Sequence, residues 1–122
     1  MKISRDSAEG RNAFTAYGEG WVEVNGQRHS SSLLVSGDRL EAWPVSRLAD
    51  LKPMDFEAIA GMAPEVVILG TGRTFDFPDP PVLATLNAAR IGVEVMDTRA
   101  ACRTYNILLG EGRNVVAAVI VP

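Results

Sequence analysis

The feature that most constrains the fold is a short apolar segment, Glu65-Val66-Val67-Ile68-Leu69-Gly70, which follows a proline. Its apolar residues are consecutive rather than alternating, which is the pattern of a β-strand buried on both faces of a sheet. Such a strand needs other elements packed against each face. The segment therefore predicts an α/β domain built around a buried sheet.

The residues after this segment predict a β-α-β-α-β unit. A proline-rich loop leads into a helix for which Asp79 suits the N-cap, Pro80 the first position and Gly92 the stop. A second strand is expected over residues 91–96, and a helix capped by Asp97 or Thr98 is expected to reach about residue 109. A final buried strand over residues 115–121 completes the unit, with a right-handed crossover between its parallel strands.

The first half of the chain predicts antiparallel strands. Residues 13–17 and 21–24 alternate in polarity, and Asn25-Gly26 is a strong signal for a two-residue hairpin turn. A second turn at Gly37-Asp38 extends the pattern. We therefore expect residues 13–43 to form one antiparallel meander, followed by a short helix over residues 55–62.

Length and composition favour one small cytoplasmic domain. The 122 residues suit a single domain, 1–122, in which residues 1–12 are expected to form a flexible tail. No apolar run approaches the roughly 20 residues of a transmembrane segment, and the N-terminus lacks the apolar stretch of a secretory signal. The net charge of −3 argues against binding nucleic acid, and a single cysteine excludes an internal disulfide.

The Gly70-Thr71-Gly72-Arg73 segment ends the buried strand, where open α/β sheets usually bind ligands. The dinucleotide fingerprint lacks its third glycine, because Phe75 occupies that position, and no phosphate-loop sequence is present. A tight turn is the simpler interpretation of the two glycines. A ligand-binding turn remains the alternative.

Other residues are expected to face this turn. Asp97 falls at the end of the next strand and is followed by Thr98, at the start of the next helix. Arg99 and Arg103 share one face of that helix, where with the Arg73 side chain they would form an anion clamp or remain solvated. The candidate binding surface is therefore Gly70, Thr71, Gly72, Arg73, Asp97, Thr98 and Arg103.

No complete catalytic constellation is evident. Cys102 and His29 are the only thiol and imidazole, but a free cysteine on an apolar helix face is usually core. Asp76 and Asp79 have the spacing of paired carboxylates, with Asp97 as a third, yet they lack further metal ligands. We predict no catalytic residue, no metal site and no cofactor.

The predicted helix after Asp97 contains residues that do not favour a helical conformation. Thr104-Tyr105-Asn106 is a polar trio that lowers helix propensity. Such residues often bond to neighbouring elements instead of solvent. Tyr105 and Asn106 are therefore expected to donate or accept hydrogen bonds between elements.

Four segments together resemble a known family: Leu69–Gly72, Gly92–Thr98, Ala100–Leu109 and Glu111–Arg113. It is the domain-of-unknown-function family shared by archaeal and bacterial proteins, the mitochondrial respiratory complex I assembly factor 3 and the adipogenesis-associated domain protein. The resemblance implies a three-layer α/β fold with a central mixed sheet, a bacterial member and no established enzymatic activity.

These observations favour a non-catalytic module that binds protein partners, linked to the assembly of a respiratory or membrane complex. Any association with a membrane would then be peripheral and made through a partner. The alternative is a small-ligand domain, for an anion or a nucleotide, or a cryptic enzyme that uses the Gly70-Thr71-Gly72 strand end.

Overall fold

The structure, a computed structural model, describes residues 10–122. Residues 1–9 of the expected tail, the part of the chain in which a secretory signal would begin, lie outside the described residues. Asn12 is held in place, since its backbone N donates to Gly37 O at 2.9 Å and its side chain donates to Ser36 O at 3.1 Å. Packing against the domain therefore begins before the first strand.

Two sheets and three helices make up the described chain. The strands are β1 (Phe14–Gly18), β2 (Trp21–Val24), β3 (Gln27–His29), β4 (Leu33–Val35), β5 (Leu40–Ala42), β6 (Val66–Gly70), β7 (Gly92–Met96) and β8 (Val115–Val119). The helices are α1 (Glu57–Gly61), α2 (Ala84–Ala88) and α3 (Thr98–Gly110), with short 3-10 turns η2 (Leu48–Asp50), η3 (Pro53–Phe56) and η4 (Pro80–Leu83).

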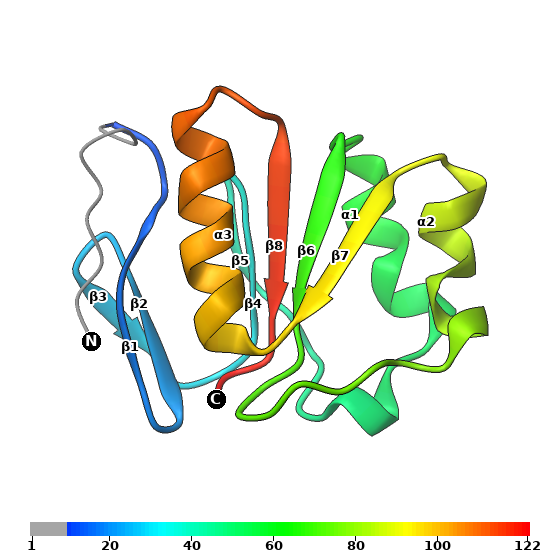
Figure 1. Cartoon of the computed structure of the whole chain (residues 1–122), viewed down its shortest axis with the longest axis horizontal. Coiled ribbons are helices and arrows are strands. Elements are labelled where there is room, and N and C mark those ends of the chain that lie inside the picture. The colour runs from blue at the N-terminus through cyan, green and yellow to red at the C-terminus, as the bar shows by residue number, and fades with distance from the viewer. Residues whose placement is uncertain (1–9) are drawn as a thin grey trace.

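The central sheet is mixed and has five strands in the order β5-β4-β8-β6-β7. β8 and β7 run parallel to β6, whereas β4 runs antiparallel to β8 and β5. All five residues of β6 and all five of β8 are buried, as their uninterrupted apolar sequences predict. The carboxyl ends of β6, β7 and β8 therefore meet at one edge, the lower edge in Figure 1.

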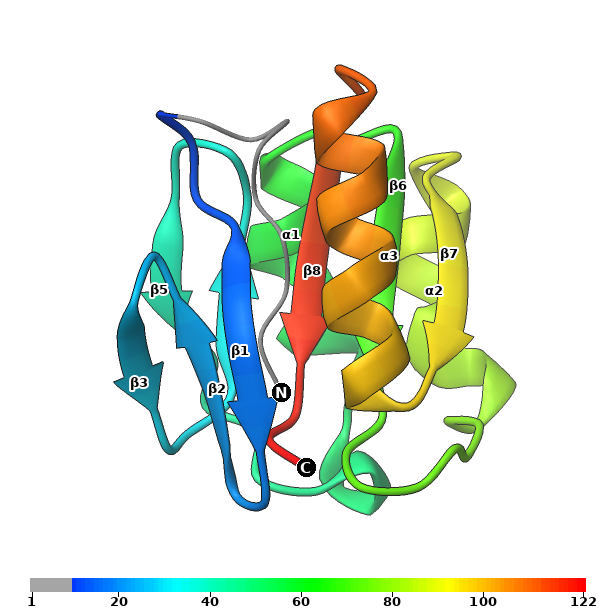
Figure 2. The ribbon, with the colours of Figure 1, turned by 60° about the vertical axis from the view of Figure 1, so that its left-hand side comes forward.

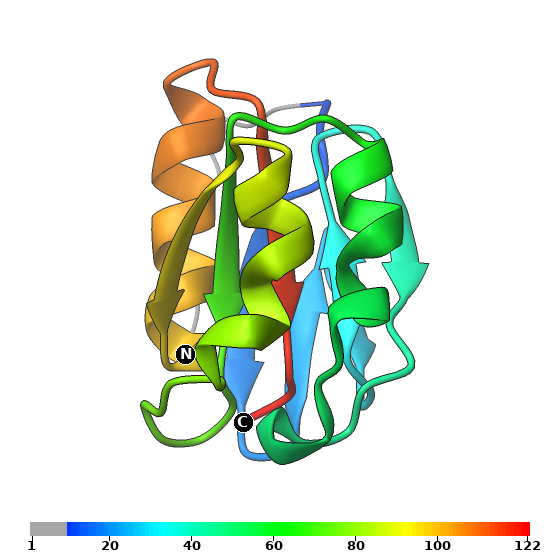
Figure 3. The same cartoon turned by 90° about the vertical axis from the view of Figure 1, so that its right-hand side faces the viewer.

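Three layers result, because side chains of the central strands point alternately to two apolar clusters. One cluster joins a face of the sheet to α3 and to the three-stranded sheet β1-β2-β3, which lies beside α3 (Figure 2). The other joins the opposite face to α1 and α2, which stand in front of the sheet in Figure 3. The expected three-layer α/β class with a central mixed sheet is confirmed.

The expectation of one meander over residues 13–43 is wrong. β1, β2 and β3 form a separate sheet, while β4 pairs with β8 through Leu33↔Val119 and joins the central sheet with β5. The reason lies in burial. Leu33, Leu34 and Val35 are all buried and need cover on both faces, whereas buried and half-buried residues alternate along β2.

The sequence correctly predicted a turn and a helix cap at positions where the backbone conformation favours particular residues. Asn25 and Gly26 have φ of 52° and 83°, as the hairpin between β2 and β3 requires. Asp97 is the N-cap of α3, its side chain accepting from Ala100 N at 3.0 Å. Arg90, with φ of 58°, ends the α2 segment, so the prediction that Gly92 is the stop is wrong and Gly92 instead begins β7.

Candidate functional site

The Gly70-Thr71-Gly72 segment is joined to both neighbouring strands and to α3. Gly70 O accepts from Ile120 N at 3.0 Å, and Thr71 N donates to Met96 O at 2.8 Å. Gly72 has φ of 105°, a conformation that strongly favours glycine, and its O accepts from Thr98 N at 2.9 Å. The backbone groups that a ligand would use are thus largely engaged by the fold.

Thr98 occupies the space that Gly70 leaves open. Its buried Oγ1 accepts from Gly72 N at 2.9 Å and donates to Ile120 O. A Cβ added at Gly70 would lie 2.8 Å from this Oγ1, so the absence of a side chain at Gly70 makes room for Thr98 rather than for a ligand. The turn is a three-way junction of β6, α3 and the end of β8.

The remaining polar residues of the candidate surface divide into two groups. Asp97 caps α3 and is placed beside Thr98. Arg73 and Arg103 both reach the three-stranded sheet: Arg73 Nη1 lies 3.8 Å from Glu19 Oε1, and Arg103 Nη1 donates to Tyr17 OH. Arg103 and Arg99 lie 5.8 and 6.0 Å from the Tyr17 ring centroid. Of the two alternatives for these arginines, a clamp or solvated side chains, neither describes these contacts, which join α3 and the Gly70–Arg73 segment to the β1-β2 hairpin.

The proline-rich loop predicted after the junction is held by local hydrogen bonds, and the exposure of its two phenylalanines was not predicted from the sequence. Thr71 Oγ1 donates to Thr74 O at 2.7 Å and accepts from Asp76 N at 3.3 Å, and Asp76 Oδ1 accepts from Phe77 N at 2.8 Å. Phe75 and Phe77, which are 53% and 66% exposed, stack edge to face with centroids 4.8 Å apart. Two phenylalanines in a proline-rich loop, outside any apolar periodicity, were the available signal.

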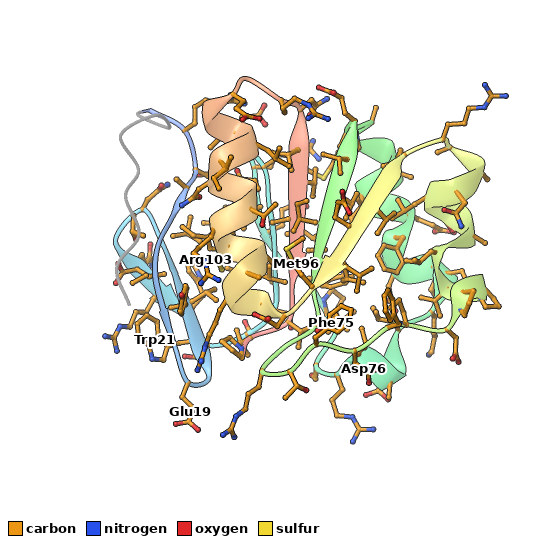
Figure 4. All side chains as sticks on the ribbon, viewed as in Figure 1. Glu19, Trp21, Phe75, Asp76, Met96 and Arg103 are labelled. Atoms are coloured by element: carbon orange, nitrogen blue, oxygen red, sulfur yellow. The ribbon has the colours of Figure 1, made fainter. Side chains whose placement is uncertain are left out.

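Figure 4 places Phe75 and Asp76 at the same edge of the molecule as Glu19 and the carboxyl ends of the parallel strands. Three surface hollows are lined by described residues, and none of these three is lined by the Gly70–Arg73 segment, Asp97, Thr98 or Arg103. One of them lies against the next part of the loop, over residues 76–79.

The thiol and imidazole do not come together. Cys102 is fully buried between α3 and the central sheet, and burial raises the pKa of its thiol to about 12. His29 lies on β3 of the other sheet and no hydrogen bond joins the two residues. A thiol with this pKa is almost wholly protonated at neutral pH, which makes Cys102 a core residue rather than a nucleophile.

The three candidate carboxylates, Asp76, Asp79 and Asp97, do not form a cation site. Within residues 10–122, no group of three or more His, Cys, Asp or Glu side chains has the geometry to hold a metal ion. Asp97 is used as a cap, and Asp79 sits at the N-cap position of η4 without accepting a side-chain capping bond, contrary to its expected role.

Tyr105 and Asn106 bond between elements as predicted. The Asn106 amide pairs with both backbone groups of Phe14, accepting from its N at 3.0 Å and donating to its O at 2.7 Å. Tyr105 OH donates to Asn12 O at 2.8 Å. Tyr105 and Asn106 therefore attach α3 to β1 and to the residues before it, which accounts for two polar residues of low helix propensity at these positions.

Comparison with known proteins identifies a family. The model of the family described as "Protein of unknown function (DUF498/DUF598)" matches residues 14–120. The chain is 30% identical to NADH dehydrogenase [ubiquinone] 1 alpha subcomplex assembly factor 3 of Xenopus tropicalis over 99% of its length, and 35% identical to the Bos taurus protein over 81%. It is 24% identical to the 13 kDa major membrane protein of Francisella tularensis, with 98% and 99% of the two chains covered.

A crystal structure of a Bordetella parapertussis protein superposes with a TM-score of 0.86 at 44% identity, covering 93% of this chain and 98% of that one. This chain spans 67% of the Xenopus assembly factor and 55% of the bovine one. Within residues 10–122, no helix combines the length and apolar character needed to cross a membrane.

Proposed function

Because this chain belongs to the protein family of unknown function DUF498/DUF598, we propose that it is a non-catalytic module that binds protein partners during assembly of a respiratory or membrane complex. Relatives that are named as assembly factors for NADH dehydrogenase support an assembly role. The chain spans only part of those relatives, so the role rests on the shared domain. The module would act in the cytoplasm and meet a membrane only through its partner.

The observation that carries this proposal is the contrast at the carboxyl edge of the central sheet. There the backbone groups of the Gly70–Gly72 turn are engaged by Thr98 and the neighbouring strands, whereas two phenylalanines on the adjoining loop remain exposed. Catalysis at strand ends needs free polar groups that converge on a substrate. Binding of a protein needs exposed, rigid apolar side chains, and aromatic anchors carry much of the energy in such interfaces.

We propose that the partner surface includes the exposed members of the candidate set, Arg73 and Arg103, together with Phe75. The buried members, Gly70, Thr71, Gly72 and Thr98, hold the loop in place, and Asp97 caps the adjoining helix. A small anion or nucleotide bound at this turn would have to displace Thr98 from Gly72 N, so the ligand-binding alternative gains no support from these contacts.

The proposal is tested in the source organism with a deletion strain and a tagged full-length chain. We expect deletion to lower the content of an assembled respiratory or membrane complex, measured on native gels, and the tagged chain to recover subunits of that complex. Phe75→Ser should reduce recovery. Ile107→Ser, which changes a 61% exposed residue at the other end of α3, should leave recovery unchanged.

Unchanged complex content in the deletion strain, together with recovery of no partner, would contradict the assembly role. Equal loss of recovery with the two serine variants would show instead that the contact is not at the carboxyl edge of the sheet.

A further inference from the structure

A small hollow lies between η2 and residues 76–79 of the proline-rich loop that follows β6. Its volume is about 250 Å³, which is below the roughly 300–1,000 Å³ of pockets for drug-sized ligands and suits one or two side chains. Leu48 and Leu51 on one side and Val82 on the other give it a small apolar wall, whereas the larger part of its lining surface is polar and includes Asp76 and Asp79. The lining residues are Leu48, Ala49, Leu51, Asp76, Phe77, Pro78, Asp79 and Val82.

The acidic lining has no counter-charge within residues 10–122. The ion pairs of this part of the chain are Arg47–Asp50, Arg73–Glu19 and Arg113–Glu65, so no lysine or arginine among these residues pairs with Asp76 or Asp79. Asp79 is also exposed and does not cap η4 with its side chain. The Asp79 carboxylate and the second oxygen of the Asp76 carboxylate, whose Oδ1 accepts from Phe77 N, therefore lack a basic partner among these residues.

The loop that presents these groups is already ordered. The Thr71 hydroxyl bonds to the backbone of Thr74 and Asp76, and Pro78, Pro80 and Pro81 restrict the following residues. Binding to a preorganised loop loses little conformational entropy. Phe77 lines the hollow while remaining 66% exposed, so its ring can contact a bound side chain.

We propose that this hollow, here named the Phe77 hollow, receives a segment of the partner protein in which a large apolar side chain adjoins a lysine or arginine. The apolar side chain packs against Leu48, Leu51 and Val82. The cation lies between the two carboxylates, in reach of the Phe77 ring, where a cation and an aromatic face attract each other. The inference rests on the proposed function, since it names the chemistry of the partner at the same edge of the sheet.

The charge of the hollow favours a basic partner segment over two other occupants, an anionic membrane surface and a second copy of this chain. Anionic lipid headgroups would be repelled by Asp76 and Asp79, which flank the exposed phenylalanine, so a membrane surface fits poorly. A second copy of the hollow would bring four carboxylates together without an intervening base, so a symmetric pair of hollows fits poorly as well. A basic, apolar segment complements both the wall and the charge.

The test places a photo-crosslinking residue, p-benzoylphenylalanine, at position 77 of the full-length chain in the source cells. The same residue at position 73 probes the wider edge of the sheet, and at position 107 it serves as an exposed control. Cross-linked peptides are sequenced by mass spectrometry. We expect position 77 to cross-link a partner segment in which a lysine or arginine lies within about two residues of a large apolar one.

The sequenced segment is then synthesised and titrated against the purified chain. We expect Phe77→Ala to weaken binding by about 30-fold, as truncation of an interface anchor does. Loss of one carboxylate in Asp79→Asn should weaken binding about fivefold and make it less sensitive to salt. Met54→Ala and Glu41→Gln are matched controls, since they change an exposed apolar residue and an exposed acid outside the hollow, and should leave binding unchanged.

The outcomes separate the two proposals. A partner cross-linked from position 73 but not from position 77 would overturn the Phe77 hollow while leaving the assembly role standing. No partner from either position would overturn the hollow and the placement of the partner surface at the carboxyl edge of the sheet, whereas the assembly role is decided by the deletion strain. A cross-link from position 77 to lipid, to another copy of this chain, or to a segment without a nearby base would also overturn the hollow's proposed occupant.

Discussion

The Thr98 hydroxyl offers the sharpest test of how the strand-end turn is held together. Thr98 is fully buried, and its Oγ1 bridges Gly72 N and Ile120 O. Thr98→Val keeps the branched shape of the side chain but removes both hydrogen bonds. The change therefore isolates the polar contribution of one atom to the junction.

The expected loss follows from the two groups left behind. An unsatisfied buried donor or acceptor costs about 1–3 kcal/mol, and Thr98→Val leaves one of each. Because the added methyl group recovers part of this through packing, we expect a net destabilisation of about 3 kcal/mol. That is a large share of the roughly 5–15 kcal/mol that stabilises a domain of this kind.

Urea unfolding measures the change, with tryptophan fluorescence as the reporter, since Trp43 is buried and Trp21 is half-buried in the folded chain. Thr98→Ser is the control, since it keeps the hydroxyl and should cost only about 1 kcal/mol for the lost methyl group. Amide exchange adds a local readout, because the Gly72 N–H should exchange much faster in the valine variant. A valine variant within about 0.5 kcal/mol of the original would refute the reasoning, provided the slope of the urea transition is unchanged.

Three further predictions concern groups that the structure explains. Asn106→Leu should destabilise the domain by about 2–4 kcal/mol, because it leaves both backbone groups of Phe14 unpaired, and amide exchange should report loosening of β1 first. The Cys102 thiol should resist iodoacetamide at mildly alkaline pH in the folded chain and react fully in concentrated guanidinium chloride, as intact-mass measurement will show. Hydrogen bonds from the Asn114 backbone and from Arg113 hold the pKa of Glu65 below its ordinary value of 4.5, so its contribution to stability is present above that value and disappears as pH falls through the lowered pKa. The stability difference between the original chain and Glu65→Gln should therefore be largest near neutral pH and vanish in acid; a difference that grew on acidification would contradict the assignment.

Part of the candidate site was predictable because it depends on local chemistry. The apolar run before Gly70 predicted a buried strand, and Asp97 predicted the start of α3 within one residue. Since strand ends meet at one edge of a sheet, the proximity of these two points followed from the β-α-β pattern. The grouping of Gly70, Gly72, Asp97 and Thr98 at one junction was thus accessible without coordinates.

The contacts that the side chains make at that junction could not be predicted from the sequence. Only the packing shows that the Thr98 hydroxyl occupies the space beside Gly70, and that Arg73 and Arg103 reach the other sheet. Each of these contacts joins residues more than 20 positions apart, and no pattern within one element encodes them. The exposure of Phe77 was not predictable for the same reason, because it depends on which distant segments pack against the loop.

The sequence by itself determined the elements of this protein: a strand buried on both faces, a glycine turn at its end, a capped helix and a tight hairpin. These follow from properties of neighbouring residues, namely apolar periodicity, backbone conformation and local hydrogen bonds. The tertiary structure alone decided that the first strands divide between two sheets and that the glycine turn is closed by Thr98. It also decided that Phe77 and two carboxylates border an open hollow, because burial and pairing depend on which distant segments meet.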